Sequence, residues 1–300
     1  MLHVKETMHH AKETMPNVRK SMLHANKSEQ DPKHLETGMS EWLANRPLFI
    51  GLDRDGTLVP IHPDPAKAMM PERVAEMVGK LARLPDVEVG IVSARSVAHL
   101  QKDFGAHCEK LFVAGNYGME ISYPGGGKFI HADAEAAKSM LITAKEEMEA
   151  RIAGGTPVLV EDHGLSLCLH WHLVEEKKLP GVSDMVKRLG DRFLNLHVRN
   201  LQTSYEVWPV SEWDKSKGLD LIQAQLKSKD KEPLFIFIGD SDGDEAAFDW
   251  VNKRGGISIR VDERAKKLKT CAKYHVDRPS DVHEFLESIL AIRSAQSLPV

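Results

Sequence analysis

Short apolar runs alternate with helical patterns along the first part of the chain. Residues 48–52 read Leu-Phe-Ile-Gly-Leu, and similar runs occur at 87–92 and 111–114. Such runs are typical of strands that are buried on both faces of a sheet. Apolar residues at helical spacing lie between them, at about 71–84 and 96–104. This alternation predicts a parallel sheet with crossover helices.

The pattern changes near residue 130. Long helical stretches cover about 132–153 and 179–192. They are accompanied by strand candidates at 157–161, 165–173, 194–199 and 204–208. Helices packed on mostly antiparallel strands indicate an α+β arrangement. We therefore expect an inserted cap domain over residues 130–208.

The α/β pattern resumes after the predicted insertion. Helices are expected at about 216–227, 243–252 and 280–292, and buried strands at 234–238 and 256–261. The predicted fold class is therefore α/β, with a parallel-sheet core and an inserted α+β cap domain. The catalytic core would consist of residues 45–129 and 209–300.

Residues 1–44 differ from the rest of the chain. Lys-Glu-Thr-Met occurs at 5–8 and again at 12–15, and large apolar residues are few. Such a segment buries little area by itself, so we expect an N-terminal tail that is flexible or loosely helical. A helix docked on a partner is the alternative.

The composition excludes several classes of protein. The 300 residues are 42% hydrophobic and 28% charged, and the formal net charge of −4 argues against a nucleic-acid partner. No apolar run approaches a membrane span or a signal peptide, so we expect no membrane partner and a cytoplasmic location. Cys108, Cys168 and Cys271 form no C-x-x-C pair, which indicates reduced thiols.

Two carboxylates follow the first predicted strand. Residues 53–57 read Asp-Arg-Asp-Gly-Thr, and open parallel sheets bind ligands beyond the carboxyl ends of their strands. The ionised carboxylates of Asp53 and Asp55 repel each other at this spacing unless a cation binds with them. Mg²⁺ prefers such oxygen ligands. A polar turn that caps the next element is the alternative.

A denser acidic group follows the strand predicted at 234–238. Asp240, Asp242, Asp244 and Glu245 lie within six residues. Four such acids repel one another unless a cation or a basic group is near. The spacing lacks the long loop and distal Glu of an EF-hand calcium site.

Other predicted strand and helix ends carry candidates for binding a phosphate. Ser93 follows the second strand and can donate to a phosphate oxygen, although Ser also commonly caps helices. Lys217, or alternatively Lys215, lies at a helix start, where its ammonium and the backbone N–H groups can reach a phosphate. A solvated basic turn is the simpler explanation for both lysines.

The order of these segments resembles the haloacid dehalogenase superfamily of phosphotransferases over about 45–285. Within it, the chain is most similar to trehalose-6-phosphate phosphatases at residues 115–120, 165–171, 206–209, 239–248 and 252–258. The resemblance implies a Rossmann-like sheet with a cap inserted after the third strand. It also implies Mg²⁺ as cofactor and a small-molecule sugar phosphate as partner. The expected reaction releases trehalose and phosphate from trehalose 6-phosphate through an aspartyl-phosphate.

The resemblance further implies roles by position. Asp53 would attack phosphorus, and Asp55 would protonate the leaving oxygen and then activate water. Ser93 and Lys217 would hold phosphate oxygens. The expected metal ligands are Asp53, the backbone carbonyl of Asp55, and Asp240, with Asp244 in support. The expected substrate contacts are Arg95, Asn116, Glu120, His170, His172 and Glu206.

Several positions depart from the family pattern. Tyr117 stands where the family usually has His, and Trp208 where it commonly has Arg. His163 replaces a usual Lys, and His172 replaces an Arg. A site for sugar hydroxyls depends on matched polar partners, so these changes bear on which sugar is bound.

Three alternatives share the same motifs. One is a phosphatase for another glycosyl phosphate, such as glycosyl-glycerol or glycosyl-glycerate phosphate. A mutase of the same fold is the second, and it would return phosphate to a sugar. The third is a regulator that binds sugar phosphate without turnover, and the intact Asp53, Asp55, Ser93 and Asp240 argue against it.

Overall fold

The chain is described by a computed structural model that divides into two compact units. The described residues are 24–25, 43–152, 158–172, 174–201, 204–209, 212–226, 232–262 and 269–296. Unit 1 takes its described residues from the part up to Ile91, from Ala106–Leu111 and from Ala224 onward, and unit 2 from Val92–Gly105 and Phe112–Gln223. The division into core and cap at residues 130 and 208 stays a prediction.

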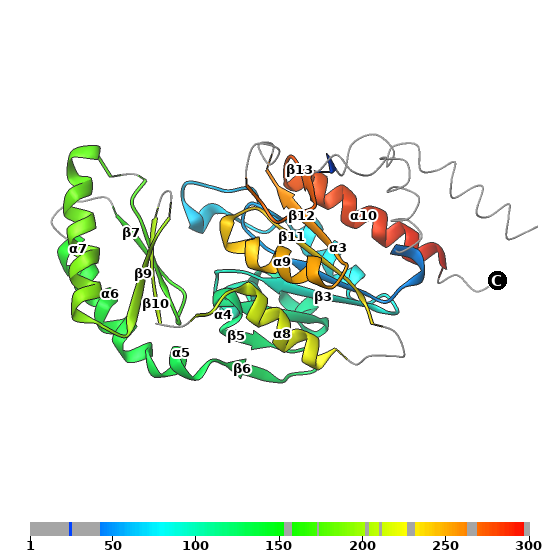
Figure 1. Ribbon diagram of the computed structural model, residues 1–300, viewed down its shortest axis with the longest axis horizontal. Coiled ribbons are helices and arrows are strands. Elements are labelled where there is room, and N and C mark those ends of the chain that lie inside the picture. Colours follow the sequence, from blue (N-terminus) through cyan, green and yellow to red (C-terminus); the bar gives the residue numbers. More distant parts are fainter. Residues whose placement is uncertain are drawn as a thin grey trace, which may run out of the picture. The chain divides into compact units, whose positions relative to one another are not determined.

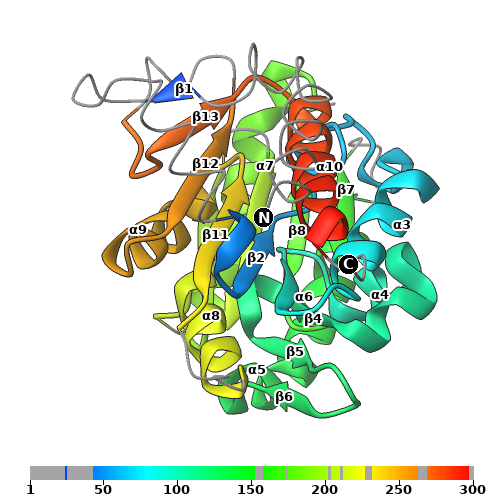
Figure 2. The same cartoon turned by 90° about the vertical axis from the view of Figure 1, so that its right-hand side faces the viewer.

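Unit 1 contains a ladder of parallel strands in the order β13, β12, β11, β2 and β3. Figure 2 shows the first four of them side by side. Every residue of β2 and β11 is buried, as expected for apolar runs covered on both faces. The α/β fold class predicted from the sequence is confirmed. The bounds are β2 Leu48–Leu52, β3 Val87–Val92, β11 Leu234–Gly239, β12 Ile257–Val261 and β13 Tyr274–Val276.

Three α-helices connect or follow these strands. Helix α3 (Glu72–Leu81) joins β2 to β3, and α9 (Glu245–Lys253) joins β11 to β12. The two crossovers run in opposite directions along the sheet, and right-handed connections then place their helices on opposite faces. Helix α10 (Pro279–Gln296) packs against α3, whereas α9 packs against β11 and β12 (Figure 1).

One short strand comes from the predicted N-terminal tail. β1 (His24–Ala25) pairs antiparallel with β13. The remainder of the tail prediction, over residues 1–23 and 26–42, lies outside the described residues.

Unit 2 begins with the elements around β4. Strands β4, β5 and β6 form two antiparallel pairs. The bounds are β4 Leu111–Gly115, β5 Glu120–Ser122, β6 Lys128–Ile130, α4 Val97–Phe104, α5 Ala132–Ala136 and α8 Lys215–Gln225. Short 3₁₀ helices cover Pro65–Lys67, Gly105–Lys110, Asn116–Gly118, Glu176–Lys178 and Asp242–Asp244 in the two units.

A second sheet in unit 2 is antiparallel, with strand order β7, β8, β10 and β9. Figure 1 shows α6 and α7 along one side of it, and apolar residues such as Leu141, Val186 and Leu169 fill the space between. The bounds are β7 Leu159–Asp162, β8 Leu167–His170, β9 Leu196–Asn200, β10 Ser204–Pro209, α6 Lys138–Ile152 and α7 Leu179–Arg192.

The elements differ from the sequence predictions in a few places. The helix expected over 132–153 is two helices, α5 and α6, and neither a Pro nor a Gly marks the break. Strands β5, β6 and β13 were not predicted, because three residues are too few to give a period. No helix in the described part of the chain is long and apolar enough to cross a membrane.

Candidate active site

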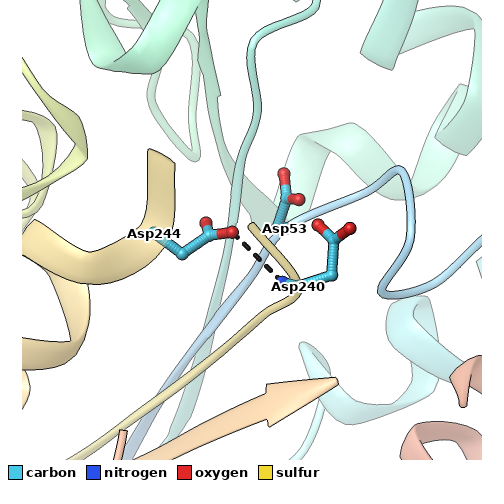
Figure 3. Close-up of side chains that lie close together, drawn as sticks. All are labelled: Asp53, Asp240 and Asp244. Carbon is cyan, nitrogen blue, oxygen red and sulfur yellow. Dashed lines mark hydrogen bonds between the residues drawn. The ribbon is translucent and has the colours of Figure 1, made fainter. Parts of the chain in front are cut away.

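Three carboxylates converge in unit 1. Asp53, Asp240 and Asp244 each offer an oxygen, and these oxygens lie within 4.8 Å of one another (Figure 3). Asp53 follows β2 and Asp240 follows β11, which are neighbouring parallel strands with Leu52 opposite Ile238. The Asp53 backbone N–H continues the ladder by donating to the Ile238 carbonyl at 2.9 Å. The shared strand direction therefore brings the two carboxylates together.

Glycines make room for this convergence. Gly56 has a φ of +77°, which favours glycine, and a Cβ there would lie 2.1 Å from Asp240 Oδ2. A Cβ on Gly239 would lie 2.3 Å from Asp244 Cγ. Any larger residue at either position would displace a carboxylate of the cluster.

The loop of residues 53–59 is held by its own backbone. The Arg54 carbonyl accepts the N–H groups of Thr57, Leu58 and Val59 at 3.3, 2.8 and 3.0 Å. The buried Arg54 guanidinium donates to the Ala68 carbonyl at 2.6 Å and to Asp55 Oδ1 at 2.5 Å. Asp55 is one-third exposed and lies outside the three-carboxylate cluster.

Asp244 is fixed by the turn that precedes α9. Its Oδ2 accepts the backbone N–H groups of Asp240 and Ser241 at 3.1 and 2.9 Å, and the Ser241 hydroxyl at 2.9 Å. These three donors hold one oxygen of the Asp244 carboxylate in place. Asp244 is fully buried, so its orientation is determined by the turn.

Arg260 pairs with the two other acids of the group predicted around residue 240. This buried residue of β12 lies opposite Gly239, and its guanidinium is 2.6 Å from Glu245 Oε1 and 3.2 Å from Asp242 Oδ1. Asp240 and Asp244 thus lie together with Asp53, whereas Asp242 and Glu245 pair with Arg260. The sequence predicted the repulsion but not this partner.

The cluster has the donors expected for a hard cation. All three ligand atoms are carboxylate oxygens, two of the residues are buried, and the third is half-buried. Mg²⁺ and Ca²⁺ take such oxygen ligands, whereas structural zinc sites are rich in sulfur and nitrogen. The residues present therefore fit a hard divalent ion.

Ser93 lies in unit 2, where its backbone and side chain are tied to its surroundings. It is buried, its N–H donates to the Ala114 carbonyl at 3.0 Å, and its carbonyl accepts the Tyr117 N–H at 2.9 Å. Its Oγ accepts the Arg95 backbone N–H at 3.2 Å. Ser93 is therefore held next to the segment of residues 115–118.

The two lysine candidates occupy different environments at the start of α8. Lys215 is 2% exposed, and its Nζ lies 5.9 Å from the centre of the Tyr117 ring. Lys217 is exposed. Of the two, only Lys215 is held by the interior of unit 2.

Asn116 and Glu120 make mainly internal hydrogen bonds. The fully buried Asn116 donates to Glu120 Oε1 at 2.8 Å and to the His163 carbonyl at 3.0 Å, and it accepts the Ser166 hydroxyl at 2.7 Å. Glu120 Oε1 also accepts the Val97 N–H at the start of α4, at 2.8 Å. These bonds connect β4, β5 and α4 with the segment between β7 and β8.

Glu161 gathers predicted substrate-binding residues around it. Arg95 Nη1 lies 3.0 Å from Oε1, and the Nε2 atoms of His170 and His163 lie 3.1 and 3.4 Å from Oε2. Burial alone would raise the pKa of the Glu161 carboxyl, but the two histidine contacts and the Arg95 charge hold it well below its usual range. The His172 ring lies 6.1 Å from the His170 ring.

Glu206, the last predicted substrate contact, lies among buried aromatic residues. Its Oε1 accepts the Tyr117 hydroxyl at 2.6 Å, and Arg199 Nη1 lies 3.8 Å from its Oε2. Burial and the Glu206 charge raise the pKa of Tyr117 well above its usual value, which keeps the phenol protonated as a donor. Sequence analysis missed Glu161, Arg199 and Arg260 as partners in these clusters.

Comparisons with known proteins agree on one family. A family model described as trehalose-phosphatase matches residues 51–280. A probable trehalose-phosphate phosphatase 3 of Oryza sativa subsp. japonica is 30% identical over 262 residues, which cover 82% of this chain and 70% of the relative. Probable trehalose-phosphate phosphatase I of Arabidopsis thaliana is 28% identical over 280 residues, which cover 89% and 74%.

Solved structures share the fold. A trehalose-6-phosphate phosphatase related protein superposes with a TM-score of 0.71 at 19% identity, over 83% of this chain and all of that one. The C-terminal domain of C. albicans trehalose-6-phosphate phosphatase gives 0.69 at 20% identity, over 84% and 97%. A haloacid dehalogenase-like hydrolase from Bacteroides thetaiotaomicron gives 0.53 at 16% identity, over 81% and 99%. The chain belongs to the trehalose-phosphatase family and is a phosphoric monoester hydrolase.

Proposed function

We propose that this chain hydrolyses trehalose 6-phosphate to trehalose and phosphate, with Mg²⁺ as cofactor and Asp53 as nucleophile. Membership of the family and the activity named for its relatives support the substrate. The observation that carries the chemistry is the convergence of Asp53 with Asp240 and Asp244 within 4.8 Å. These carboxylates can ligate a divalent cation, and a nucleophilic carboxylate needs such a cation beside it because it otherwise repels a phosphate dianion.

The proposed metal ligands are Asp53, Asp240 and the backbone carbonyl of Asp55. Asp244 supports them, since its Oδ2 binds the backbone N–H groups of Asp240 and Ser241 and so orients the turn. Bound Mg²⁺ would neutralise negative charge on the phosphate and the carboxylates.

The first chemical step uses the two acids of the loop 53–59. An Asp53 oxygen attacks phosphorus in line with the bond to the sugar oxygen, and that bond breaks as the aspartyl-phosphate forms. Asp55 gives its proton to the departing sugar oxygen, so trehalose leaves neutral.

The second step releases phosphate. Asp55, now ionised, removes a proton from a water molecule whose oxygen attacks phosphorus. The bond between phosphorus and Asp53 breaks, which regenerates the Asp53 carboxylate and frees inorganic phosphate. Both acids thereby return to their starting protonation states.

Ser93 and a lysine are proposed to hold the phosphate oxygens. Ser93 directly follows β3, and its carbonyl accepts the Tyr117 N–H at 2.9 Å. Lys215 suits the role better than Lys217, because a buried ammonium loses less entropy on binding than an exposed one. Sequence analysis favoured Lys217. Separate substitutions of Lys215 and Lys217 therefore test which lysine binds the phosphate.

The sugar is proposed to bind the polar residues around Glu161. Arg95, His170 and His172 come from the predicted substrate contacts, and Glu161 joins Arg95 and His170 through contacts at 3.0 and 3.1 Å. Carboxylate, guanidinium and imidazole groups together supply both acceptors and donors for sugar hydroxyls. A sugar that leaves one of these buried groups without a hydrogen-bond partner is strongly disfavoured.

A phosphate-release assay over a panel of sugar phosphates tests the function. We expect trehalose 6-phosphate among the best substrates, with Asp53→Asn slower by at least about a thousandfold. Asp242→Asn is the matched control, because Asp242 is exposed and pairs with Arg260 outside the cluster. A clear preference for a glycosyl-glycerol or glycosyl-glycerate phosphate would overturn the substrate, and retained turnover in Asp53→Asn would overturn the nucleophile.

A further inference from the structure

Three consecutive residues of unit 2 have left-handed backbone conformations. The φ angles of Asn116, Tyr117 and Gly118 are 49°, 58° and 91°. Only the third is a glycine, and a bulky residue such as tyrosine adopts this region at a cost in free energy. Such strain persists only where the surrounding contacts determine it, and it is concentrated at functional sites.

Contacts on every side hold this segment in place. The Asn116 side chain makes three internal hydrogen bonds. The Tyr117 N–H donates to the Ser93 carbonyl at 2.9 Å, and its own carbonyl accepts Trp213 Nε1–H at 3.2 Å. A Cβ on Gly118 would lie 2.6 Å from the Cα of Gly218 in α8, so the two backbones are in direct contact.

The Tyr117 side chain links further groups. Its hydroxyl donates to Glu206 Oε1 at 2.6 Å, and its ring lies 5.9 Å from Lys215 Nζ. The edge of the Trp208 ring, with centroids 5.8 Å apart, supports it from another side. A cation within about 6 Å of a ring centroid is attracted by the ring, more strongly when water is excluded.

We propose that Tyr117 is a positioning residue that sets the places of Ser93 and Lys215. Its backbone fixes Ser93 and its ring fixes the Lys215 ammonium, so one residue spaces the hydroxyl and the cation that hold the phosphate. This inference rests on the proposed function, in which those two groups bind phosphate oxygens.

Glu206 acts in this arrangement through Tyr117. Its Oε1 is occupied by the phenol, and its buried Oε2 has no hydrogen-bond partner in the described part of the chain, with Arg199 Nη1 at 3.8 Å. The negative charge next to the hydroxyl increases the electron density of the ring that faces Lys215. Glu206 is therefore assigned to orienting the ring rather than to direct contact with the sugar.

Ring removal tests the proposal. Tyr117→Asn removes the ring while tolerating the left-handed backbone, and Tyr117→Phe keeps the ring and removes only the hydroxyl. We expect Tyr117→Asn to raise the inhibition constant of inorganic phosphate about tenfold and to lower kcat, as loss of a desolvated cation–ring contact would. Tyr117→Phe keeps the ring but loses the bond to Glu206 that orients it, so we expect an intermediate increase of about threefold, and no change in Tyr123→Phe, a half-buried tyrosine elsewhere in the unit.

A double-mutant cycle with Lys215→Ala shows whether Tyr117 acts through Lys215. In a chain that already carries Lys215→Ala, Tyr117→Asn should change the inhibition constant of phosphate little further. If the two residues acted independently, the fold-changes of the two substitutions would multiply. The positioning role would be overturned if the two fold-changes multiplied. It would also be overturned if Tyr117→Asn left phosphate inhibition unchanged while Lys215→Ala weakened it. A normal Lys215→Ala would instead overturn the lysine assignment of the proposed function. Tyr117→Leu replaces Tyr117→Asn in the cycle if the latter does not fold.

Discussion

At the scale of single residues, acidic side chains in each unit are assigned to different partners. In unit 1, Arg260 binds Asp242 and Glu245, and the remaining acids join Asp53. In unit 2, Glu161 accepts contacts from Arg95 and two histidines. These cationic partners offset part of the repulsion among the clustered acids.

The lowered pKa of Glu161 predicts how stability depends on pH. The carboxyl is held well below its usual pKa in the folded chain, so below about pH 4.3 the unfolded chain binds the proton first. The stabilisation is therefore complete above that pH and is lost as the pH falls toward the folded value. We expect wild type to be more stable than Glu161→Gln at pH 7, and the difference to shrink below about pH 4.

Urea unfolding of both proteins between pH 7 and pH 3 measures this difference. Glu149→Gln, at an exposed helix residue outside the Glu161 cluster, serves as the control for removing one carboxylate. A gap between wild type and Glu161→Gln that widens on acidification would contradict the predicted sign.

At the scale of elements, the last helix supports the loop that carries Asp53. His283 of α10 is buried, and its Nε2–H donates to the Leu58 carbonyl at 2.9 Å. Helix α10 also packs against α3, so the loop 53–59 is braced by the C-terminal element of unit 1. Turns that position reacting groups depend on such support from rigid elements.

Substitution of His283 separates the hydrogen bond from simple packing. His283→Leu leaves the Leu58 carbonyl without this donor, and we expect the free energy of unfolding to fall by about 1–3 kcal/mol. His283→Gln places an amide donor near the position of Nε2 and should restore part of the stability and of kcat. Urea unfolding and a phosphate-release assay measure both variants. Equal losses in the two would show that the hydrogen bond contributes little.

The elements that the sequence predicted best are those with the strongest local pattern. Continuous apolar runs identified β2, β3 and β11, and the acids at their carboxyl ends identified Asp53 and Asp240. The partners escaped prediction because they depend on strand register. Arg260 meets the acidic turn only because β12 lies beside β11 with Arg260 opposite Gly239.

The same limit applies to unit 2. Glu161 and His170 contact each other across the antiparallel β7 and β8 pair, a pairing that periodicity alone does not specify. The choice between Lys215 and Lys217 depended on burial, which two lysines in one short polar turn do not reveal. Local sequence pattern thus predicts the strands and the acids that follow them. The contacts between side chains depend on strand pairing and burial.

At the scale of the whole molecule, two segments far apart in the sequence form one centre because their strands are adjacent. β2 and β11 are parallel neighbours, so Asp53 and Asp240 leave the sheet at the same edge. The long stretch of chain between them contains all of unit 2.

Binding of Mn²⁺, a spectroscopic substitute for Mg²⁺, tests the central claim that this cluster holds one divalent ion. Titration followed by electron paramagnetic resonance should give one site per chain in wild type and in the Asp242→Asn control. Asp240→Asn should weaken that site by about ten- to a hundredfold, as the loss of a ligating or supporting carboxylate does. Unchanged affinity in Asp240→Asn, or an equal loss in Asp242→Asn, would contradict the assignment of Asp53, Asp240 and Asp244 to the ion.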